Sequence, residues 1–189
     1  MSYPWCNRYN LKTLKVTGEG DLLTFETPSE KAEVHLKNNS IEKVSVTVNG
    51  EKKMIPFSEA HHIVVGEGNF KRDVYHFLTP KGLAPHLRLG LTQHQGLGTW
   101  SSLPHPFELK PELGFEELFF YLLQGGTQKA LQVGKGVCCD GAEVNAAWFV
   151  QNRSWGVIPM GYHPVVGEPQ VHVSYVWAYL AKKKEWEKI

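Results

Sequence analysis

The sequence predicts an all-β protein, either a β-sandwich or a small β-barrel. Its 18 glycines and 11 prolines separate short runs rich in Val, Ile, Thr, Phe, Tyr and Trp, a pattern typical of many short strands joined by turns. Sustained helical periodicity is absent before the C-terminal end. A chain of 189 residues can bury one well-filled core, so one domain or two small ones are expected.

The clearest strand signal is a hairpin centred on Asn49-Gly50. Val44, Val46 and Val48 alternate with polar residues before it, and a second run follows it in "VSVTVNGEKKMI". Asn-Gly suits the type I′ turn that joins antiparallel strands, so two strands are expected here. Further strands are expected, in chain order, in "LRLGLTQHQ", "LFFYLL", "NAAWFVQ" and "VHVSYVWAYL".

The strand that begins at Glu117 is expected to be buried on both of its faces. Residues 118–123 are all apolar or aromatic, and the two-residue period of a strand places them alternately on its two sides. Glu117 shares a face with Phe119, Tyr121 and Leu123. A carboxylate in such a place needs a partner or a changed protonation state. Glu117 is therefore a candidate functional residue.

A second candidate is the histidine of "VIPMGYHPVVG". His163 lies between Gly161 and Pro164, which interrupt regular structure, and apolar runs flank this corner on both sides. A tight corner can hold an imidazole rigidly, and we expect this one to direct His163 inward. Because Glu117 also lies beside a turn-rich connection, a shared pocket is favoured over a merely structural pair.

Charge and composition disfavour several classes of partner. The 20 Lys and Arg residues balance 19 Asp and Glu residues, so the net charge of +1 creates no general attraction for nucleic acid or an anionic membrane. Lys182, Lys183 and Lys184 are interrupted by nearby glutamates and are interpreted as a solvated tail. No partner of either kind is expected.

The remaining composition indicates a reduced, cytosolic protein. The N-terminal "MSYPWCNRYN" lacks the order of a signal peptide, and no apolar run approaches the roughly 18 residues of a membrane span. Cys6, Cys138 and Cys139 cannot all pair, so no disulfide framework is expected. There is also no G-x-S-x-G, phosphate-binding loop or paired C-x-x-C motif.

Several segments together resemble a known family. "GLGTWSSLPHP", "FEELFFYLL" and "GVIPMGYHPVV", followed by a Tyr- and Trp-rich strand, resemble the C-terminal half of the IolB/KduI isomerases. "RDVYHFLTPKGLAPHLRLG" resembles the segment leading into that half. The family, which comprises 5-deoxyglucuronate and 5-keto-4-deoxyuronate isomerases, has the cupin fold. The resemblance implies a C-terminal cupin domain at 72–189 and an N-terminal β region at 1–71, which could be a truncated, non-catalytic cupin of a shortened bicupin.

The resemblance also implies a divalent transition metal (Zn, Mn, Fe, Co or Ni). The family holds it with an H-x-H, a glutamate and the histidine of "GYHP". Carried over by motif, the ligands are His105, Glu117 and His163. Two imidazoles and one carboxylate leave positions open for water or substrate, as catalytic sites require. Glu108 or His94 could add a fourth ligand.

The first metal motif departs from the family pattern. In "WSSLPHPFE" only His105 can serve, and then only if one residue is deleted relative to the family. With that deletion Phe107 occupies the place of the second histidine, and without it the two places hold Pro106 and Glu108. The H-x-H is therefore incomplete.

The family chemistry implies an aldose–ketose isomerase acting on a uronate or deoxyuronate in carbohydrate or inositol catabolism. The metal polarises a carbonyl and eases removal of the neighbouring proton. Candidates for carrying that proton are Glu116, Glu108 and Tyr121. Alternation along the last strand places three aromatic residues on one face, where they could form the floor of a sugar site: Tyr175, Trp177 and Tyr179.

Two other functions stay open. One is a diverged, non-catalytic cupin that binds a small carbohydrate or has a regulatory or structural role, since fold does not guarantee function. The other is an oxygenase with a two-histidine, one-carboxylate iron site. In every case the expected partners are a small carbohydrate or sugar acid and a second copy of the chain. A homodimer or higher oligomer is expected because edge strands need cover, with the segment through "KAEVHL" covering a partner.

Overall fold

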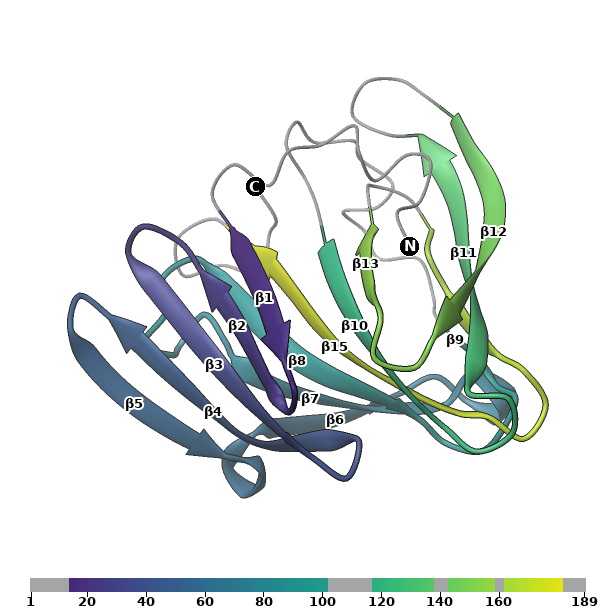
Figure 1. Ribbon diagram of the computed structural model, residues 1–189, viewed down its shortest axis with the longest axis horizontal. Coiled ribbons are helices and arrows are strands. Elements are labelled where there is room, and N and C mark those ends of the chain that lie inside the picture. Colours follow the sequence, from purple (N-terminus) through teal and green to yellow (C-terminus); the bar gives the residue numbers. More distant parts are fainter. Residues whose placement is uncertain (1–13, 102–116, 138–142, 159–161, 182–189) are drawn as a thin grey trace.

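The computed structural model describes residues 14–101, 117–137, 143–158 and 162–181. These residues form three antiparallel sheets, shown in Figure 1. The first sheet has the order β1-β2-β3-β4-β5. Its strands are β1 (Lys15–Glu19), β2 (Leu22–Glu26), β3 (Glu30–Lys37), β4 (Ser40–Val48) and β5 (Glu51–Pro56).

The second sheet has six strands in the order β13-β10-β15-β8-β7-β6. In chain order they are β6 (His61–Val65), β7 (Arg72–Leu78), β8 (Leu87–His94), β10 (Glu117–Gln124), β13 (Trp155–Ile158) and β15 (His172–Leu180). The third sheet has the order β12-β11-β14-β9. It contains β9 (Trp100–Ser101), β11 (Lys129–Val137), β12 (Glu143–Gln151) and β14 (Val165–Gly167).

Helical structure is minor in the described ranges. Short 3-10 turns occupy Phe57–Glu59 and Gly68–Phe70. Within the same ranges no helix is long and apolar enough to cross a membrane. The expectation of an all-β chain is therefore confirmed.

The predicted hairpin is present as strands β4 and β5. Val48 lies opposite Glu51, and Asn49 and Gly50 form the turn with φ values of 51° and 84°. Positive φ at both central residues is the signature of a type I′ turn, which Asn and Gly adopt at low cost. The sequence prediction is confirmed here.

The six-stranded sheet is the middle layer of the molecule. In Figure 1 the first sheet covers one of its faces, and β11 and β12 lie toward the other. Accordingly, Leu118, Phe120 and Leu122 of β10 belong to a core cluster shared with the first sheet. Phe119 and Tyr121 belong to a second cluster, shared with the third sheet. The expectation that this strand is buried on both faces is confirmed.

The N-terminal segment through "KAEVHL" forms the first three strands of the first sheet. The strand containing "KAEVHL" is β3, which pairs with β2 on one side and β4 on the other. Ala32, Val34 and Leu36 are buried in the core cluster shared with the six-stranded sheet of the same chain. β3 therefore has no open edge, whereas β1 of the same segment lies at an edge of the sheet, and the expectation that this segment covers a partner stays a prediction. The expected division of the chain at residues 71 and 72 stays a prediction.

Gly90 of β8 leaves room for the ring of Trp177 on the neighbouring strand β15. A Cβ atom at this position would lie 2.2 Å from Cζ2 of Trp177 and 2.5 Å from the carbonyl oxygen of Tyr75. We expect Gly90→Ala to lower the free energy of unfolding by about 1–3 kcal/mol through overpacking. Urea unfolding measures the change. Lys53→Ala on the exposed strand β5 is the control, and a loss at Gly90 no larger than the control's contradicts the prediction.

Candidate functional site

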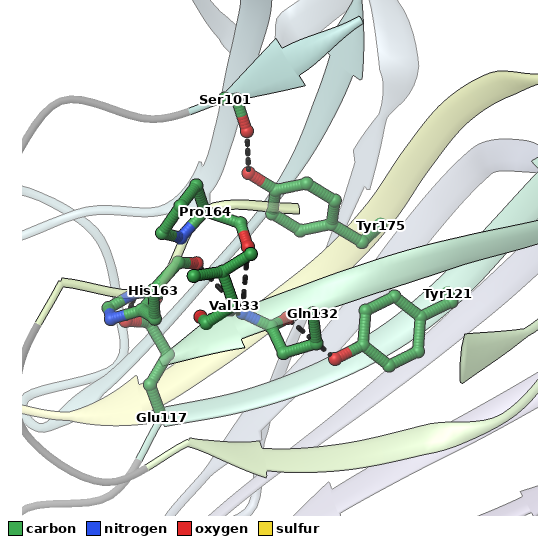
Figure 2. A network of polar contacts seen from close by, with 8 residues as sticks. All are labelled: Ser101, Glu117, Tyr121, Gln132, Val133, His163, Pro164 and Tyr175. Atoms are coloured by element: carbon green, nitrogen blue, oxygen red, sulfur yellow. Dashed lines mark hydrogen bonds and ion pairs between the residues drawn. The ribbon is translucent and has the colours of Figure 1, made fainter. Parts of the chain in front are cut away.

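Glu117 and His163 meet in the interior between the second and third sheets. Glu117 begins β10, opposite Tyr179 of β15, and His163 directly precedes Pro164 and β14. His163 Nε2 lies 3.3 Å from Glu117 Oε2, and the two side chains are only 3% and 6% exposed. The ring of Phe119 meets the imidazole edge-on at 5.6 Å. The structure thus brings together two residues that lie far apart in the sequence (Figure 2).

This pair has the chemistry and spacing of two metal ligands. A carboxylate oxygen and an imidazole nitrogen are donors that divalent transition metals accept. Two such donors, each about 2.0–2.2 Å from a tetrahedral ion, lie about 3.3–3.6 Å from each other. The observed 3.3 Å between His163 Nε2 and Glu117 Oε2 fits this separation. The pair can therefore hold a metal ion jointly.

The other expected ligands are not placed beside this pair. His105, Glu108 and Glu116 lie outside the described residues. Within the described part of the chain, no group of three or more His, Cys, Asp or Glu residues could hold a metal. A complete ligand set would need a further donor, for which His105 remains the sequence-based candidate.

His94 cannot be a fourth ligand. The strand register aligns Glu117 with Tyr179 and Tyr179 with Arg88, whereas His94 lies six positions further along β8. At about 3.3 Å per residue this is roughly 20 Å along the strand. His94 Nδ1 instead lies 2.8 Å from Thr99 Oγ1, inside the other end of the sheet. The expectation of His94 as a ligand is wrong because sequence does not reveal strand register.

The aromatic residues of β15 share one buried face, as expected from their spacing. Tyr175, Trp177 and Tyr179 are 5–7% exposed. Tyr175 stacks on Phe119 with ring centroids 4.5 Å apart, while Trp177 and Tyr179 stack at 6.0 Å. Only Tyr179 lies directly opposite Glu117. Tyr179 is therefore the member of this set directly beside Glu117, while Trp177 and Tyr175 lie opposite Phe119 and Tyr121.

The hydroxyl of Tyr179 is held in its protonated form. Burial raises the pKa of Tyr179 most strongly, and the negative charge of Glu117 raises it further, against a smaller opposing effect of Arg88. A phenol in this state donates a hydrogen bond at neutral pH. Tyr179 can therefore act as a fixed donor beside the Glu117 carboxylate.

Arg88 places a positive charge in the same cross-strand row. It lies opposite Tyr179, which lies opposite Glu117, so two strand spacings of roughly 10 Å separate the backbones of Arg88 and Glu117. The Arg88 side chain is fully buried. Its Nη atoms donate to the carbonyl oxygens of Ala84, Pro85 and Leu87 at 3.0–3.1 Å. These bonds hold the guanidinium at the start of β8.

Gln132 is the polar residue of this interior that the sequence interpretation missed. It lies on β11 and is completely buried. Its amide nitrogen donates to the carbonyl oxygens of His163 and Pro164, and its amide oxygen accepts from the Tyr121 hydroxyl at 2.8 Å. The available signal was the strand period in "KALQVGKGV", which places Gln132 on the same face as Ala130, Gly134 and Gly136, where it is the one polar side chain.

Comparisons with known proteins place the chain in a family. The model of the KduI/IolB family matches residues 19–189. The 5-deoxy-glucuronate isomerase of Halalkalibacterium halodurans is 29% identical over 127 residues, which are 65% of this chain and 46% of that enzyme. The enzyme of the same name from Geobacillus kaustophilus is 27% identical over 139 residues, 71% of this chain and 49% of that enzyme. The chain thus spans about half the length of the curated relatives it matches.

A solved structure supports the same fold. An IolB-like protein from Salmonella typhimurium LT2 is similar over 94% of this chain and 74% of that protein, with a TM-score of 0.59 and 18% sequence identity. The expected cupin architecture is confirmed. Since the family model also covers most of the sequence, the chain belongs to the KduI/IolB family.

Proposed function

We propose that the chain is a metal-dependent aldose–ketose isomerase acting on a uronate or deoxyuronate, in carbohydrate or inositol catabolism. The observation that carries this proposal is the buried Glu117–His163 pair, whose 3.3 Å separation suits two ligands of one metal. Family membership and relatives named 5-deoxy-glucuronate isomerase support the reaction class.

In this proposal Glu117, His163 and His105 hold the ion. A divalent cation in such a site polarises a carbonyl oxygen and makes the neighbouring C–H bond more acidic. Isomerisation then requires one proton to leave that carbon and one to reach the former carbonyl carbon, while the hydroxyl on the first carbon loses its proton and the former carbonyl oxygen gains one. We assign this transfer to Glu116 or Glu108 rather than to Tyr121, because the Tyr121 O–H donates to Gln132.

The row beside Glu117 supports an anionic sugar as substrate. Arg88 contributes a buried positive charge, and Tyr179 contributes a protonated hydroxyl beside the Glu117 carboxylate. Because the Arg88 guanidinium is buried and bonded to backbone carbonyls, its charge favours a nearby carboxylate without contacting it, while the Tyr179 hydroxyl can donate to a sugar oxygen. The aromatic faces of Trp177 and Tyr179 suit the apolar C–H side of a sugar ring.

The direct test is turnover by the purified protein. The protein, loaded separately with Zn, Mn, Fe, Co or Ni, is incubated with 5-deoxyglucuronate, glucuronate and galacturonate, and ketose formation is followed by NMR. We expect turnover of at least one uronate, its loss on chelation and its return when metal is added back. Absence of turnover with every metal rejects an isomerase.

A non-catalytic, carbohydrate-binding cupin is the second candidate. The incomplete H-x-H around His105 favours it, because Phe107 or Glu108 stands where the family has its second histidine. The two candidates differ in metal content. Elemental analysis of protein purified without added metal is expected to show near-stoichiometric transition metal for the isomerase and none for the binding protein.

We further propose that the chain forms a homodimer or higher oligomer. Strands β5 and β6 each lie at one edge of their sheet, and all five residues of β6 are at least partly exposed. Open strand edges are commonly covered by association. Light scattering at micromolar concentration is expected to give at least twice the chain mass, whereas a mass near 21.4 kDa contradicts association.

A further inference from the structure

The corner that carries His163 has a gap in its backbone hydrogen bonds. Gln132 pairs with Val165, and Lys135 forms a bridge with Tyr162, so the intervening residues of the two segments continue the same register. Tyr162 and Lys135 exchange both backbone bonds, at 2.6 and 2.7 Å. The next such pair is incomplete because proline has no N–H to donate.

The incomplete pair joins Val133 to Pro164. The Val133 N–H donates to the Pro164 carbonyl oxygen at 2.8 Å. The return bond, from residue 164 to the Val133 carbonyl, cannot form. In a dry interior an unsatisfied carbonyl weakens the local structure, and here it would do so directly beside His163.

The Gln132 side chain supplies the missing donor. Its Nε2 lies 3.0 Å from the Val133 carbonyl oxygen, 2.9 Å from that of His163 and 3.1 Å from that of Pro164. Two N–H groups are thus shared among three carbonyls. Figure 2 shows this amide between the corner and Tyr121.

Tyr121 fixes which way the amide faces. Its hydroxyl donates to Gln132 Oε1 at 2.8 Å, so the oxygen is held toward β10 and the nitrogen toward the corner. Both side chains are fully buried, which shields the chain of bonds from water. Tyr121 thus bonds to Gln132, and Gln132 bonds to the carbonyl groups of the corner. The corner carries the imidazole of His163, which lies against Glu117.

We infer that Gln132 and Tyr121 are positioning residues that hold His163 in the orientation in which it meets Glu117. This inference rests on the proposed function in one respect, which is that the Glu117–His163 pair binds metal. Supporting groups of this kind typically contribute 10–100-fold to metal affinity. The inference replaces the proton-carrying role expected for Tyr121 with a structural one.

The variants to test are Gln132→Met, which keeps the length of the side chain and removes its hydrogen bonds, and Tyr121→Phe. The matched control is Asn152→Ala. The Asn152 side chain also accepts a bond from a buried strand, from the N–H of Leu123 at 3.0 Å, but Asn152 lies beside Gln128, four residues before Gln132 and away from the corner. Asn152→Ala therefore shows what a loss of stability does when the hydrogen bonds of the corner are kept.

The first measurement needs no metal. In metal-free protein, amide hydrogen exchange at Val133 and Lys135, which bond to the corner, is expected to be at least tenfold faster in Gln132→Met than in wild type. A smaller increase is expected in Tyr121→Phe. Exchange in β3 should be unchanged, and Asn152→Ala should leave the corner amides at their wild-type rates.

The second measurement is Zn²⁺ affinity by calorimetry. Gln132→Met is expected to bind Zn²⁺ 10–100-fold more weakly than wild type, with Asn152→Ala within twofold of wild type. Adding Pro164→Ala to Gln132→Met restores an N–H opposite the Val133 carbonyl. That second change is expected to recover part of the lost affinity, which a general loss of stability would not do.

The outcomes separate the inference from the proposed function. Unchanged corner exchange in Gln132→Met overturns the inference, and so does unchanged Zn²⁺ affinity or an equal loss in Asn152→Ala. Failure of the wild-type protein to bind any of the proposed metals overturns the proposed metal function instead. In that case the exchange comparison alone decides whether Gln132 and Tyr121 hold the corner.

Discussion

Replacing His163 by alanine or Glu117 by glutamine is expected to abolish tight metal binding. The first change removes an imidazole donor, and the second keeps the shape of the side chain but removes the charge that offsets the cation. Because the ligands come from separate strands, bound metal should stabilise wild type by roughly 3–4 kcal/mol at a hundred to a thousand times its dissociation constant. Chelator should lower the wild-type melting temperature and leave both variants unchanged.

The same experiment distinguishes a metal site from a structural pair. In a metal-free structural pair, His163→Ala removes a partner of the buried Glu117 carboxylate and lowers stability by roughly 1–3 kcal/mol whether or not chelator is present. The deciding quantity is the shift that chelator causes in wild type prepared with metal. A shift indistinguishable from zero rejects the metal site.

Lowering the pH from 6.5 to 4.5 is expected to destabilise the fold by roughly 2 kcal/mol through His94 alone. Burial, followed by the positive charge of Arg72 and the nearby His172, lowers the pKa of His94 from 6.5 to about 3. The unfolded chain therefore takes up a proton that the folded chain rejects. The part of the unfolding free energy that depends on neutral His94 is fully present above about pH 6.5 and is lost as the pH falls toward 3.

The pH effect can be isolated with His94→Leu. Loss of the contact with Thr99 lowers stability equally at every pH, but the slope of unfolding free energy against pH should fall by about 1.4 kcal/mol per pH unit below 6.5. Urea unfolding at pH 7, 5.5 and 4.5 measures this slope. His62→Leu, at an exposed histidine, is the control. A wild-type slope in His94→Leu contradicts the assignment.

Local signals in the sequence were sufficient for individual elements. Asn49-Gly50 predicts its hairpin because few residue pairs adopt two consecutive positive φ angles at low cost. The apolar run after Glu117 predicts a strand between two cores, because a strand exposed on one face would alternate with polar residues. In both cases the signal is contained in the residues of the element itself.

Register and sheet order could not be obtained in this way. His94 was a reasonable ligand by residue type, yet pairing of β8 with β15 places it roughly 20 Å along the strand from the level of Glu117. Likewise, the residues of "KAEVHL" alone do not reveal that their strand lies between β2 and β4. Both outcomes depend on which strands pair, and pairing is decided by burial across the whole sheet.

The sequence by itself determined the all-β class, the principal hairpin, the doubly buried strand and the family to which the chain belongs. It also singled out Glu117 and His163, because a carboxylate and an imidazole beside turns interrupt apolar runs. Only the tertiary structure decided that these two side chains lie 3.3 Å apart and that Gln132 supports the corner between them. The residues in these contacts are 31 and 46 positions apart in the sequence. Distances between residues so far apart are set by sheet packing and not by local preference.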